Sequence, residues 1–467
     1  MSLSKEQVLL LVNCMYATPR IGTFSAMSSY EGQTIREWID SMNIHSPSFK
    51  SSNAFMNTRE WLQTFGAVMR EEVLLDMIIL TTHVDNSPGG GGGQSAVFTD
   101  ERGKEAVVAF KGTEGANEWA DNFRGGNLTD TVQQKNALQW YRAVYAEFGL
   151  DAYDVTLSGH SKGGNKAKYI TLMDESVKRC FSYDGQGFSD LFIHEYSGFI
   201  LARQHKIENH NVDYDYVNLL LNDVGETFFY KRYNTDGNIL ENHCPNAFMK
   251  FSEDNSFVLV PNPAGQAKAM IAMDELLNAM LRAMPESQKN STLNMLADIV
   301  NACFPLGADN TTDKLRNIVF SPDSASEIAY LAAYLVRYEQ EKPEMARLVG
   351  EVLDKFGMGE LMETVDKIDG LLNARIKTPF GTIMRFNSAV RLISGIGRVF
   401  RGTPDWLLSG VKGAVGVDLR NDEIRALFRI MRRMSFFLRT IKILDNGQDL
   451  KVEAGLPDKP RGEFFPG

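Results

Sequence analysis

The stretch "YDVTLSGHSKGGNKAKYITLM" constrains the fold of this chain more than any other part of the sequence. "YDVTL" predicts a buried strand, "NKAKYITLM" predicts a helix, and Ser161 lies on the short connection between them. Gly159 and Gly163 stand two positions before and two positions after this serine. On so sharp a turn, side chains at those two positions would collide with neighbouring backbone, whereas glycine avoids the collision. The pattern therefore predicts a strained turn that lifts the Ser161 hydroxyl above the edge of a sheet; the alternative is a turn with a purely structural role.

The flanking patterns predict an α/β fold with a mostly parallel sheet. Polar capping residues, Ser4 with Gln7 and Thr34 with Glu37, predict two helices near the N-terminus, and a longer helical stretch is expected over 58–84. "SAVFTDERGKEAVVAFKGT" predicts two strands joined by a polar turn, and "CFSYDG" and "YDYVNLLLND" predict later strands. Helical patterns dominate after "PNPAG", so we expect one domain over 1–260 and a mainly helical domain over 261–467.

A serine needs a base and an acid to act as a nucleophile, and the chain contains only seven histidines. In an α/β-hydrolase the base follows the nucleophile and the acid along the chain. His243, in the loop-like "ILENHCPNAF", is the predicted base. His160 is expected to pack on the sheet side of the turn, and the charged segment containing His194, His205 and His210 is expected to lie on solvated helices or loops.

The acid should emerge at the carboxyl end of a strand. Asp223 ends the apolar run "YVNLLLND" and is the favoured candidate, while Asp184, at the end of "CFSYD", is the competitor. Either aspartate could instead cap a turn at a strand end.

Two backbone amides are candidates for holding an oxyanion. The amide of Lys162 lies at the start of the predicted helix, where the helix dipole favours negative charge. The amide of Thr113 follows the strand "VVAF", and Gly112 before it allows the backbone to approach a substrate closely.

The segments "VVAFKGT", "EWADNF", "LSGHSKGGNKA", "CFSYDGQGF" and "LLNDVG", followed by a histidine, resemble the class 3 (fungal-type) lipases. They are more similar still to a bacterial α/β-hydrolase branch described as a domain of unknown function. The resemblance covers about residues 1–255 and implies an α/β-hydrolase fold, with Ser161 as nucleophile, Asp223 as acid, His243 as base, and Thr113 and Lys162 as oxyanion donors. Lys111 stands where class 3 lipases usually have arginine, and Val224-Gly225 stand where they usually have proline, so a preference for acyl-chain length does not transfer.

The composition limits the classes of partner. A net charge of −10 argues against a nucleic-acid-binding protein. Four scattered cysteines without a CxxC pair, and a start without a basic segment before its apolar run, predict a cytoplasmic protein and leave signal-independent export open. No run of apolar residues is long enough for a membrane-spanning helix, and no motif predicts a cofactor or a metal.

The C-terminal half carries a local excess of positive charge. Between Arg385 and Lys442, twelve lysines and arginines stand against four acidic residues. In "IRALFRIMRRMSFFLRTIKIL" the apolar residues fall on one helical stripe and the basic residues lie off it. Such a helix could dock on an anionic membrane surface or pack with its cationic face in solvent.

Three functions are therefore considered. The first is a serine hydrolase acting on acyl esters or lipids, which the intact Ser161, Asp223 and His243 favour. The second is a catalytically silent hydrolase fold that serves as a binding or scaffold module. The third is a membrane-acting lipase or phospholipase effector whose C-terminal half delivers the enzyme.

Overall fold

The structure is a computed structural model that describes two compact units of the chain. The first unit comprises Met1–Ile271 with Gln448–Gly467, and the second comprises Ala272–Gly447. The predicted domain boundary near residue 260 stays a prediction, because a domain is a segment that folds independently and this division into units does not test independent folding. The residues that the structure describes are 2–18, 24–51, 56–89, 91, 93–113, 121–233, 239–303, 314, 317–321, 323–355, 375–377, 383–385, 421–443, 452–453 and 456–457.

A seven-stranded sheet forms the centre of the first unit. Its strands lie in chain order, β1-β2-β3-β4-β5-β6-β7. The first two pairings are antiparallel and the next four are parallel, which confirms the expected mostly parallel α/β sheet. The strands are β1 (Ile78–Asp85), β2 (Gly93–Asp100), β3 (Glu105–Phe110), β4 (Asp154–His160), β5 (Arg179–Tyr183), β6 (Ile207–Val212) and β7 (Glu226–Tyr230).

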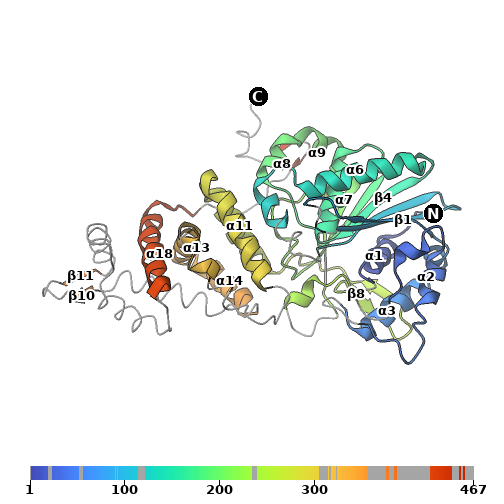
Figure 1. Ribbon diagram of the computed structural model, residues 1–467, viewed down its shortest axis with the longest axis horizontal. Helices are drawn as coiled ribbons and strands as arrows, with labels where there is room; N and C mark the ends of the chain where they lie inside the picture. The colour runs from blue at the N-terminus through green and yellow to red at the C-terminus, as the bar shows by residue number, and fades with distance from the viewer. Residues whose placement is uncertain are drawn as a thin grey trace. The chain divides into compact units, whose positions relative to one another are not determined.

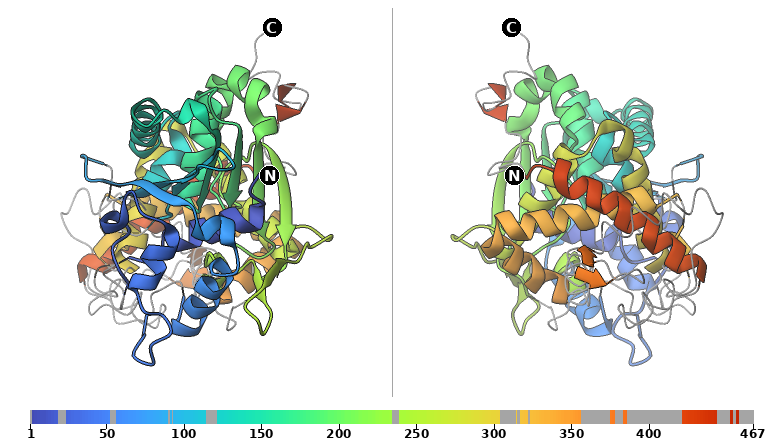
Figure 2. Two further views of the ribbon diagram at one scale, coloured as in Figure 1. Left: turned by 90° about the vertical axis from the view of Figure 1, so that its right-hand side faces the viewer. Right: turned by 90° about the vertical axis from the view of Figure 1, so that its left-hand side faces the viewer.

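Helices cover both faces of this sheet (Figures 1 and 2). On one face, side chains such as Val108 and Leu157 pack against the long helices α6 and α7; on the other, alternate side chains such as Val107 pack against the N-terminal helices. Because successive side chains of a strand point to opposite faces, both cores require apolar residues, and β3 is buried along its whole length. The helices are α1 (Lys5–Cys14), α2 (Ile35–Ser41), α3 (Thr58–Val68), α4 (Glu72–Leu75), α6 (Val132–Glu147), α7 (Lys162–Met173), α8 (Asp190–Glu195) and α9 (Ser197–Arg203).

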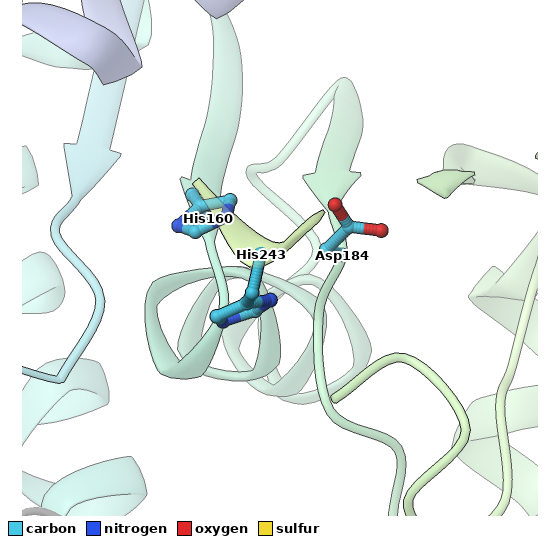
Figure 3. Close-up of side chains that lie close together, drawn as sticks. All are labelled: His160, Asp184 and His243. Carbon is cyan, nitrogen blue, oxygen red and sulfur yellow. The ribbon is translucent and has the colours of Figure 1, made fainter. Parts of the chain in front are cut away.

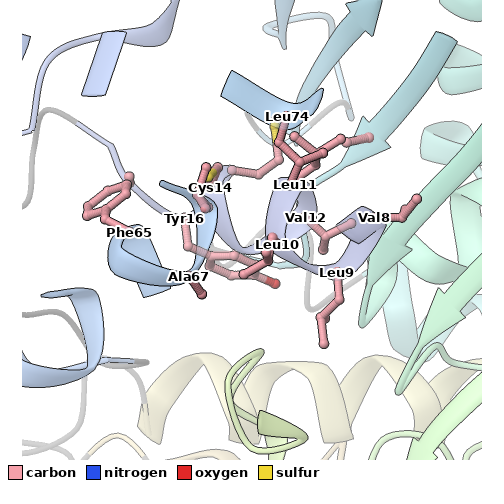
Figure 4. Packing of buried hydrophobic residues seen from close by; sticks show 14 of the residues in the cluster. Val8, Leu9, Leu10, Leu11, Val12, Cys14, Tyr16, Phe65, Ala67 and Leu74 are labelled. Atoms are coloured by element: carbon pink, nitrogen blue, oxygen red, sulfur yellow. The ribbon is translucent and has the colours of Figure 1, made fainter. Parts of the chain in front are cut away.

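The N-terminal helix α1 lies in the middle of the second core (Figure 4). Its predicted capping box is present: the Ser4 hydroxyl accepts from the Gln7 amide, and the Gln7 side chain accepts from the Ser4 amide. All residues from Val8 to Cys14 are buried. The helix is therefore apolar around its circumference, as expected for a helix enclosed by a sheet and other helices.

The turn between β4 and α7 has the predicted conformation. Ser161 has φ 60° and ψ −127°, which few non-glycine residues adopt. A Cβ atom at Gly159 would lie 2.3 Å from the carbonyl carbon of Gly163, and one at Gly163 would lie 2.0 Å from the carbonyl oxygen of Phe110. These glycines let the first turn of α7 lie directly on the backbone of β3 and β4.

We expect Gly163→Ala to lower the free energy of unfolding by at least about 3 kcal/mol, because the new methyl group would overlap backbone that cannot move aside. Gly198→Ala in α9 is the matched control, since its Cβ would meet nothing within 4 Å; it should raise stability by about 0.5–1 kcal/mol. Urea denaturation of both variants measures the difference. Equal midpoints for Gly163→Ala and the wild type would contradict the close packing at this turn.

Two predictions of secondary structure in this unit are wrong, and one of them also changes the environment of a histidine. The helix expected over 58–84 ends in α3 and α4, and the chain then forms β1, so His83 lies on a strand. The strand expected from "YDYVNLLLND" is a loop, and the preceding polar segment Ile207–Val212 forms β6 instead. His210 on β6 is accordingly buried, with its Nδ1 3.0 Å from the Tyr230 hydroxyl, rather than solvated as expected.

Short elements after β7 complete the first unit. The 3-10 helix η5 (Ile239–His243) carries the predicted base, and β8 (Met249–Phe251) pairs with β9 (Phe257–Leu259) in a separate antiparallel ribbon. Other short 3-10 helices are η1 (Met27–Tyr30), η2 (Gly125–Asn127), η3 (Leu150–Ala152) and η4 (Gln204–Lys206).

The second unit is mainly helical, as the sequence predicts. The predicted basic helix is α18, and its buried side chains pack along α13, with the Tyr330 and Phe437 rings 5.3 Å apart (Figure 1). Among the described residues, no helix combines the length and the apolar character needed to cross a bilayer. The helices are α10 (Lys268–Ala283), α11 (Glu286–Cys303), α13 (Ala325–Glu341), α14 (Pro343–Lys355) and α18 (Asn421–Thr440), and the short strands are β10 (Arg375–Lys377) and β11 (Ile383–Arg385). The short strands β12 (Val452–Glu453) and β13 (Leu456–Pro457) belong to the first unit.

Candidate active site

Ser161 stands at the carboxyl edge of the parallel strands, between β4 and α7. Its amide donates to the carbonyl of Tyr183 at the end of β5 (2.9 Å), and its own carbonyl accepts from Asn165 in α7 (3.2 Å). The residue is 5% exposed. The strained backbone of Ser161 is thus held by β5 and by α7. The residue lies at the point where β4 ends and α7 begins.

The two residues predicted to hold an oxyanion lie beside a shared pair of polar side chains. The Lys162 ammonium forms a buried ion pair with Asp121 (2.7 Å). The next residue, Asn122, donates from its side chain to the Thr113 hydroxyl (2.9 Å). Asn122 also accepts, through its carbonyl, from Gln186 in the loop after β5 (2.9 Å). Asp121 and Asn122 therefore connect the Thr113 loop to the start of α7.

His243 is held by a buried carboxylate. Its Nδ1 lies 2.6 Å from Oδ2 of Asp215, a residue with no exposed surface. The other oxygen of Asp215 accepts from the backbone amides of Val217 (2.8 Å) and Asn218 (2.7 Å). Nε2 of His243 is buried and has no hydrogen-bond partner among the described residues. This arrangement fixes the imidazole through one nitrogen and leaves the other nitrogen able to exchange a proton.

The sequence prediction of Asp223 as the partner of His243 is wrong. The Asp223 carboxylate instead forms an ion pair with Lys168, a fully buried residue of α7 whose ammonium also donates to the Gly185 carbonyl (3.3 Å). The predicted strand that placed Asp223 at a sheet edge is the loop after β6, and Asp215 stands near the start of that loop. The carboxyl edge of β6 therefore supplies Asp215, eight positions before the predicted acid.

His160, expected to be a packing residue, links the turn to the N-terminal helix. Its Nδ1 lies 2.6 Å from the hydroxyl of Tyr16, which also accepts from the amide of Gly112 (3.2 Å). Burial lowers the pKa of His160 well below its usual value, so the ring is neutral at physiological pH.

His160, Asp184 and His243 gather at the end of strands β4 and β5 (Figure 3). One nitrogen or oxygen of each lies within 4.8 Å of the others, and the two imidazole rings are 4.6 Å apart. Two imidazoles and a carboxylate form a donor set that divalent transition ions accept. However, Oδ1 of Asp184 already accepts hydrogen bonds from Val212 and Asn218, and burial together with the charge of Asp215 raises the pKa of this carboxyl well above its usual range. We therefore interpret the cluster as part of the environment of the His243–Asp215 pair and not as a metal site.

The structure brings together most of the predicted site residues. Ser161 adjoins His160, whose ring contacts that of His243, while Lys162 and Thr113 share the Asp121–Asn122 pair. The predicted hydrogen bond between Ser161 and His243 stays a prediction.

The family comparison agrees with this topology. Residues 93–298 match the model of the Mbeg1-like family. This region contains strands β2 to β7 and is similar to that family. The match begins with β2 and ends within α11, so the matched region contains Ser161, Asp215 and His243, whereas Tyr16 lies outside it.

A curated relative matches a short part of this chain. An extracellular phospholipase A1 of Serratia liquefaciens is 32% identical over 101 residues, which is 22% of this chain and 30% of that protein. The chain thus spans about a third of the length of the curated relative it matches.

Solved lipase structures are similar at low sequence identity. The Rhizomucor miehei lipase propeptide complex is 14% identical, with 39% of this chain and 74% of that chain covered and a TM-score of 0.26. The Lip2 lipase of Yarrowia lipolytica is 11% identical, with 48% and 79% covered and a TM-score of 0.28.

Proposed function

We propose that this protein is a serine hydrolase that cleaves carboxylic esters of lipid-like molecules. Ser161 is the nucleophile, His243 the general base and Asp215 the acid that orients the base, in place of the predicted Asp223. The amides of Thr113 and Lys162 are the proposed oxyanion donors. The observation that carries this proposal is the buried His243–Asp215 pair beside a serine on a strained turn between a strand and a helix.

The proposed reaction follows from these positions. His243 takes the proton from the Ser161 hydroxyl at Nε2 while Oγ attacks the ester carbonyl carbon, and the carbonyl oxygen becomes an oxyanion. Collapse of this intermediate breaks the ester C–O bond, and the imidazolium donates its proton to the departing alcohol. A water molecule, deprotonated by His243, then releases the acid from Ser161 by the same steps.

The substrate class is proposed from the relative. The matching relative is a phospholipase A1, which supports an acyl ester of a lipid as the substrate. No metal or cofactor is proposed, because a neutral imidazole and a carboxylate supply the acid–base chemistry of ester hydrolysis. A catalytically silent scaffold is less favoured, because nothing in binding alone requires an imidazole fixed by a buried carboxylate.

The proposal is tested by labelling the wild-type protein with a fluorophosphonate probe and locating the adduct by peptide mass spectrometry. A panel of p-nitrophenyl esters and phospholipids then defines the acyl group that is cleaved. We expect the adduct on Ser161 and turnover of at least one ester. A protein that neither reacts with the probe nor hydrolyses any ester of the panel would instead be the silent scaffold.

The described cysteines support the proposed cytoplasmic location. Cys14, Cys180 and Cys244 are free and buried. Burial raises the pKa of the Cys14 and Cys180 thiols to about 12, so neither is ionised at neutral pH. Free thiols of this kind are typical of proteins that fold in a reducing compartment.

A second proposed property is peripheral contact with an anionic membrane through α18. The exposed side of this helix carries Arg429, Arg432 and Arg433, whereas Met431 and Met434 on its other side are fully buried. Because the apolar stripe is covered within the second unit, such contact would rest on charge and not on insertion into the bilayer.

We expect the protein to bind vesicles containing phosphatidylserine more tightly than neutral phosphatidylcholine vesicles, since each basic residue near an anionic surface contributes about 1 kcal/mol. Changing Arg429, Arg432 and Arg433 together to glutamine should remove most of this preference and leave hydrolysis of a soluble ester unchanged. Vesicle co-sedimentation at low and high salt measures the effect, which screening should weaken. Equal binding of the wild type to both vesicle types, or lower thermal stability of the triple variant, would instead indicate that these arginines serve packing within the protein.

A further inference from the structure

Asp184 is connected to the His243–Asp215 pair through one asparagine. Oδ1 of Asp184 accepts from the side chain of Asn218 (2.9 Å) and from the amide of Val212 at the end of β6 (2.8 Å). The backbone amide of the same Asn218 donates to Asp215 (2.7 Å). Asn218 thus holds one carboxyl with its side chain and the other with its backbone.

The position of Asn218 is fixed from several sides. Its side-chain amide also donates to the Val212 carbonyl (3.1 Å), and its side-chain oxygen accepts from Gln266 (3.2 Å). Asp184 and Asp215 have no exposed surface, and Asn218 is 7% exposed. The loop that carries Asp215 is therefore attached by buried hydrogen bonds of Asn218 to Asp184 after β5 and to Val212 at the end of β6.

We propose that Asp184 and Asn218 are positioning residues for the acid–base pair: Asp184 holds Asn218, and Asn218 holds Asp215 in line with His243. The inference rests on the proposed function, because it assigns the His243–Asp215 pair to catalysis. Neither residue is proposed to touch the substrate. Oδ2 of Asp184 is buried without a hydrogen-bond partner among the described residues, so its contribution comes through Oδ1.

The burial of two carboxyl groups in one site favours an uncharged Asp184. The titratable groups that face it are Asp215 and Asp213 on the loop after β6, His160 at the end of β4 and His243 in η5. Burial, followed by the charge of Asp215, raises the pKa of Asp184 well above its usual value. If Asp184 lost its proton as the pH rises, two carboxylates would share one buried site, and Asp215 would be displaced from His243.

The experiment compares two substitutions that fit the backbone of residue 184, which has φ 44°. Asparagine and glycine both tolerate this left-handed conformation, so neither variant introduces backbone strain. Asp184→Gly removes the acceptor and should lower kcat/KM for a soluble ester by about tenfold or more, as a displaced acid–base pair does. Asp184→Asn keeps a neutral acceptor and should restore kcat/KM at neutral pH to within about threefold of the wild type.

The pH dependence separates positioning from a general loss of stability. In the wild type, a carboxyl with a raised pKa in the folded protein makes stability and activity fall as the pH rises toward that pKa. In Asp184→Asn this fall with rising pH should be absent, and the melting temperature of the variant should exceed that of the wild type by a margin that grows with pH. Asp174→Asn, which removes a carboxylate that pairs with Arg142 and lies outside this network of hydrogen bonds, is the matched control and should keep the wild-type dependence on rising pH.

A readout independent of turnover is the low-field proton resonance of the Nδ1–H of His243. It should be lost or shifted in Asp184→Gly and restored in Asp184→Asn. Loss of activity in Asp184→Asn equal to that in Asp184→Gly, or an unchanged resonance in Asp184→Gly, would overturn the inference. A wild-type protein without esterase activity would overturn the proposed function instead, and the resonance would still decide whether Asp184 positions the pair.

Discussion

Alanine in place of Ser161 should lower kcat for a short-chain p-nitrophenyl ester by about 10⁵-fold or more, and it should abolish labelling by a fluorophosphonate. Without the hydroxyl, no acyl-enzyme can form, and the base has no nucleophile to activate. The fold should persist, because alanine and serine adopt the strained conformation at residue 161 at similar cost. Initial rates and intact-protein mass after incubation with the probe measure both effects.

Ser158→Ala provides a matched control for this substitution. Ser158 is another buried serine of β4, and its hydroxyl donates to the Phe181 carbonyl (2.8 Å). Its removal should cost about 1 kcal/mol of stability and leave the labelled residue unchanged. A Ser161→Ala protein that still accepts the probe would show that another residue is the nucleophile, and the role assigned to the strand–turn–helix connection would be wrong.

The turn at Ser161 can be predicted from the sequence because its causes are local. Gly159 and Gly163 are needed by backbone that lies only a few ångströms away, and the adjoining strand and helix have clear apolar periodicity. The capping boxes at Ser4 and Thr34 are predictable for the same reason, since each involves residues three positions apart. Patterns of this kind do not depend on the rest of the chain.

Strand β6 cannot be predicted from its sequence, because its stability depends on distant partners. Asn209, His210 and Asn211 are residue types typical of a solvated segment, yet all three are buried. The Asn209 side chain donates to the Val224 carbonyl (2.8 Å), and the Tyr230 hydroxyl lies 3.0 Å from the His210 ring. Polar residues can occupy a buried strand when such hydrogen bonds are formed, and here the partners lie in β7 or just before it, outside the segment itself.

The error over the acid follows from the error over β6. The apolar run before Asp223 predicts a strand, but it lies in a loop in which Leu219 is buried and Leu221 has φ 71°. With β6 ending at Val212, Asp215 comes three residues after the strand, where an acid is expected. The sequence signal that could have identified it is the pair of aspartates in "NVDYDYVN", which come directly after the short segment "IENHNV" that forms β6. Tyr16 and Asn218 act through partners far along the chain and leave no comparable signal.

Asparagine in place of Asp215 should lower kcat by about 10⁴-fold. The side-chain oxygen of the new amide should remain on the backbone amides of Val217 and Asn218, so its NH₂ group would face Nδ1 of His243. Nδ1 would then have to accept a hydrogen bond, and the imidazole proton would move to Nε2. In that tautomer the ring cannot take the proton of Ser161. The pH dependence of kcat for a soluble ester measures the loss.

Asp223→Asn is the matched control, because Asp223 is the acid expected from the sequence. In the structure this carboxylate compensates the charge of the buried Lys168, so its removal should lower the free energy of unfolding by about 3 kcal/mol. Its kcat should stay within about threefold of the wild type at a temperature where both proteins are folded. The opposite pattern, with a large loss of kcat in Asp223→Asn and little change in Asp215→Asn, would restore Asp223 as the acid and show that the His243–Asp215 hydrogen bond has no catalytic role.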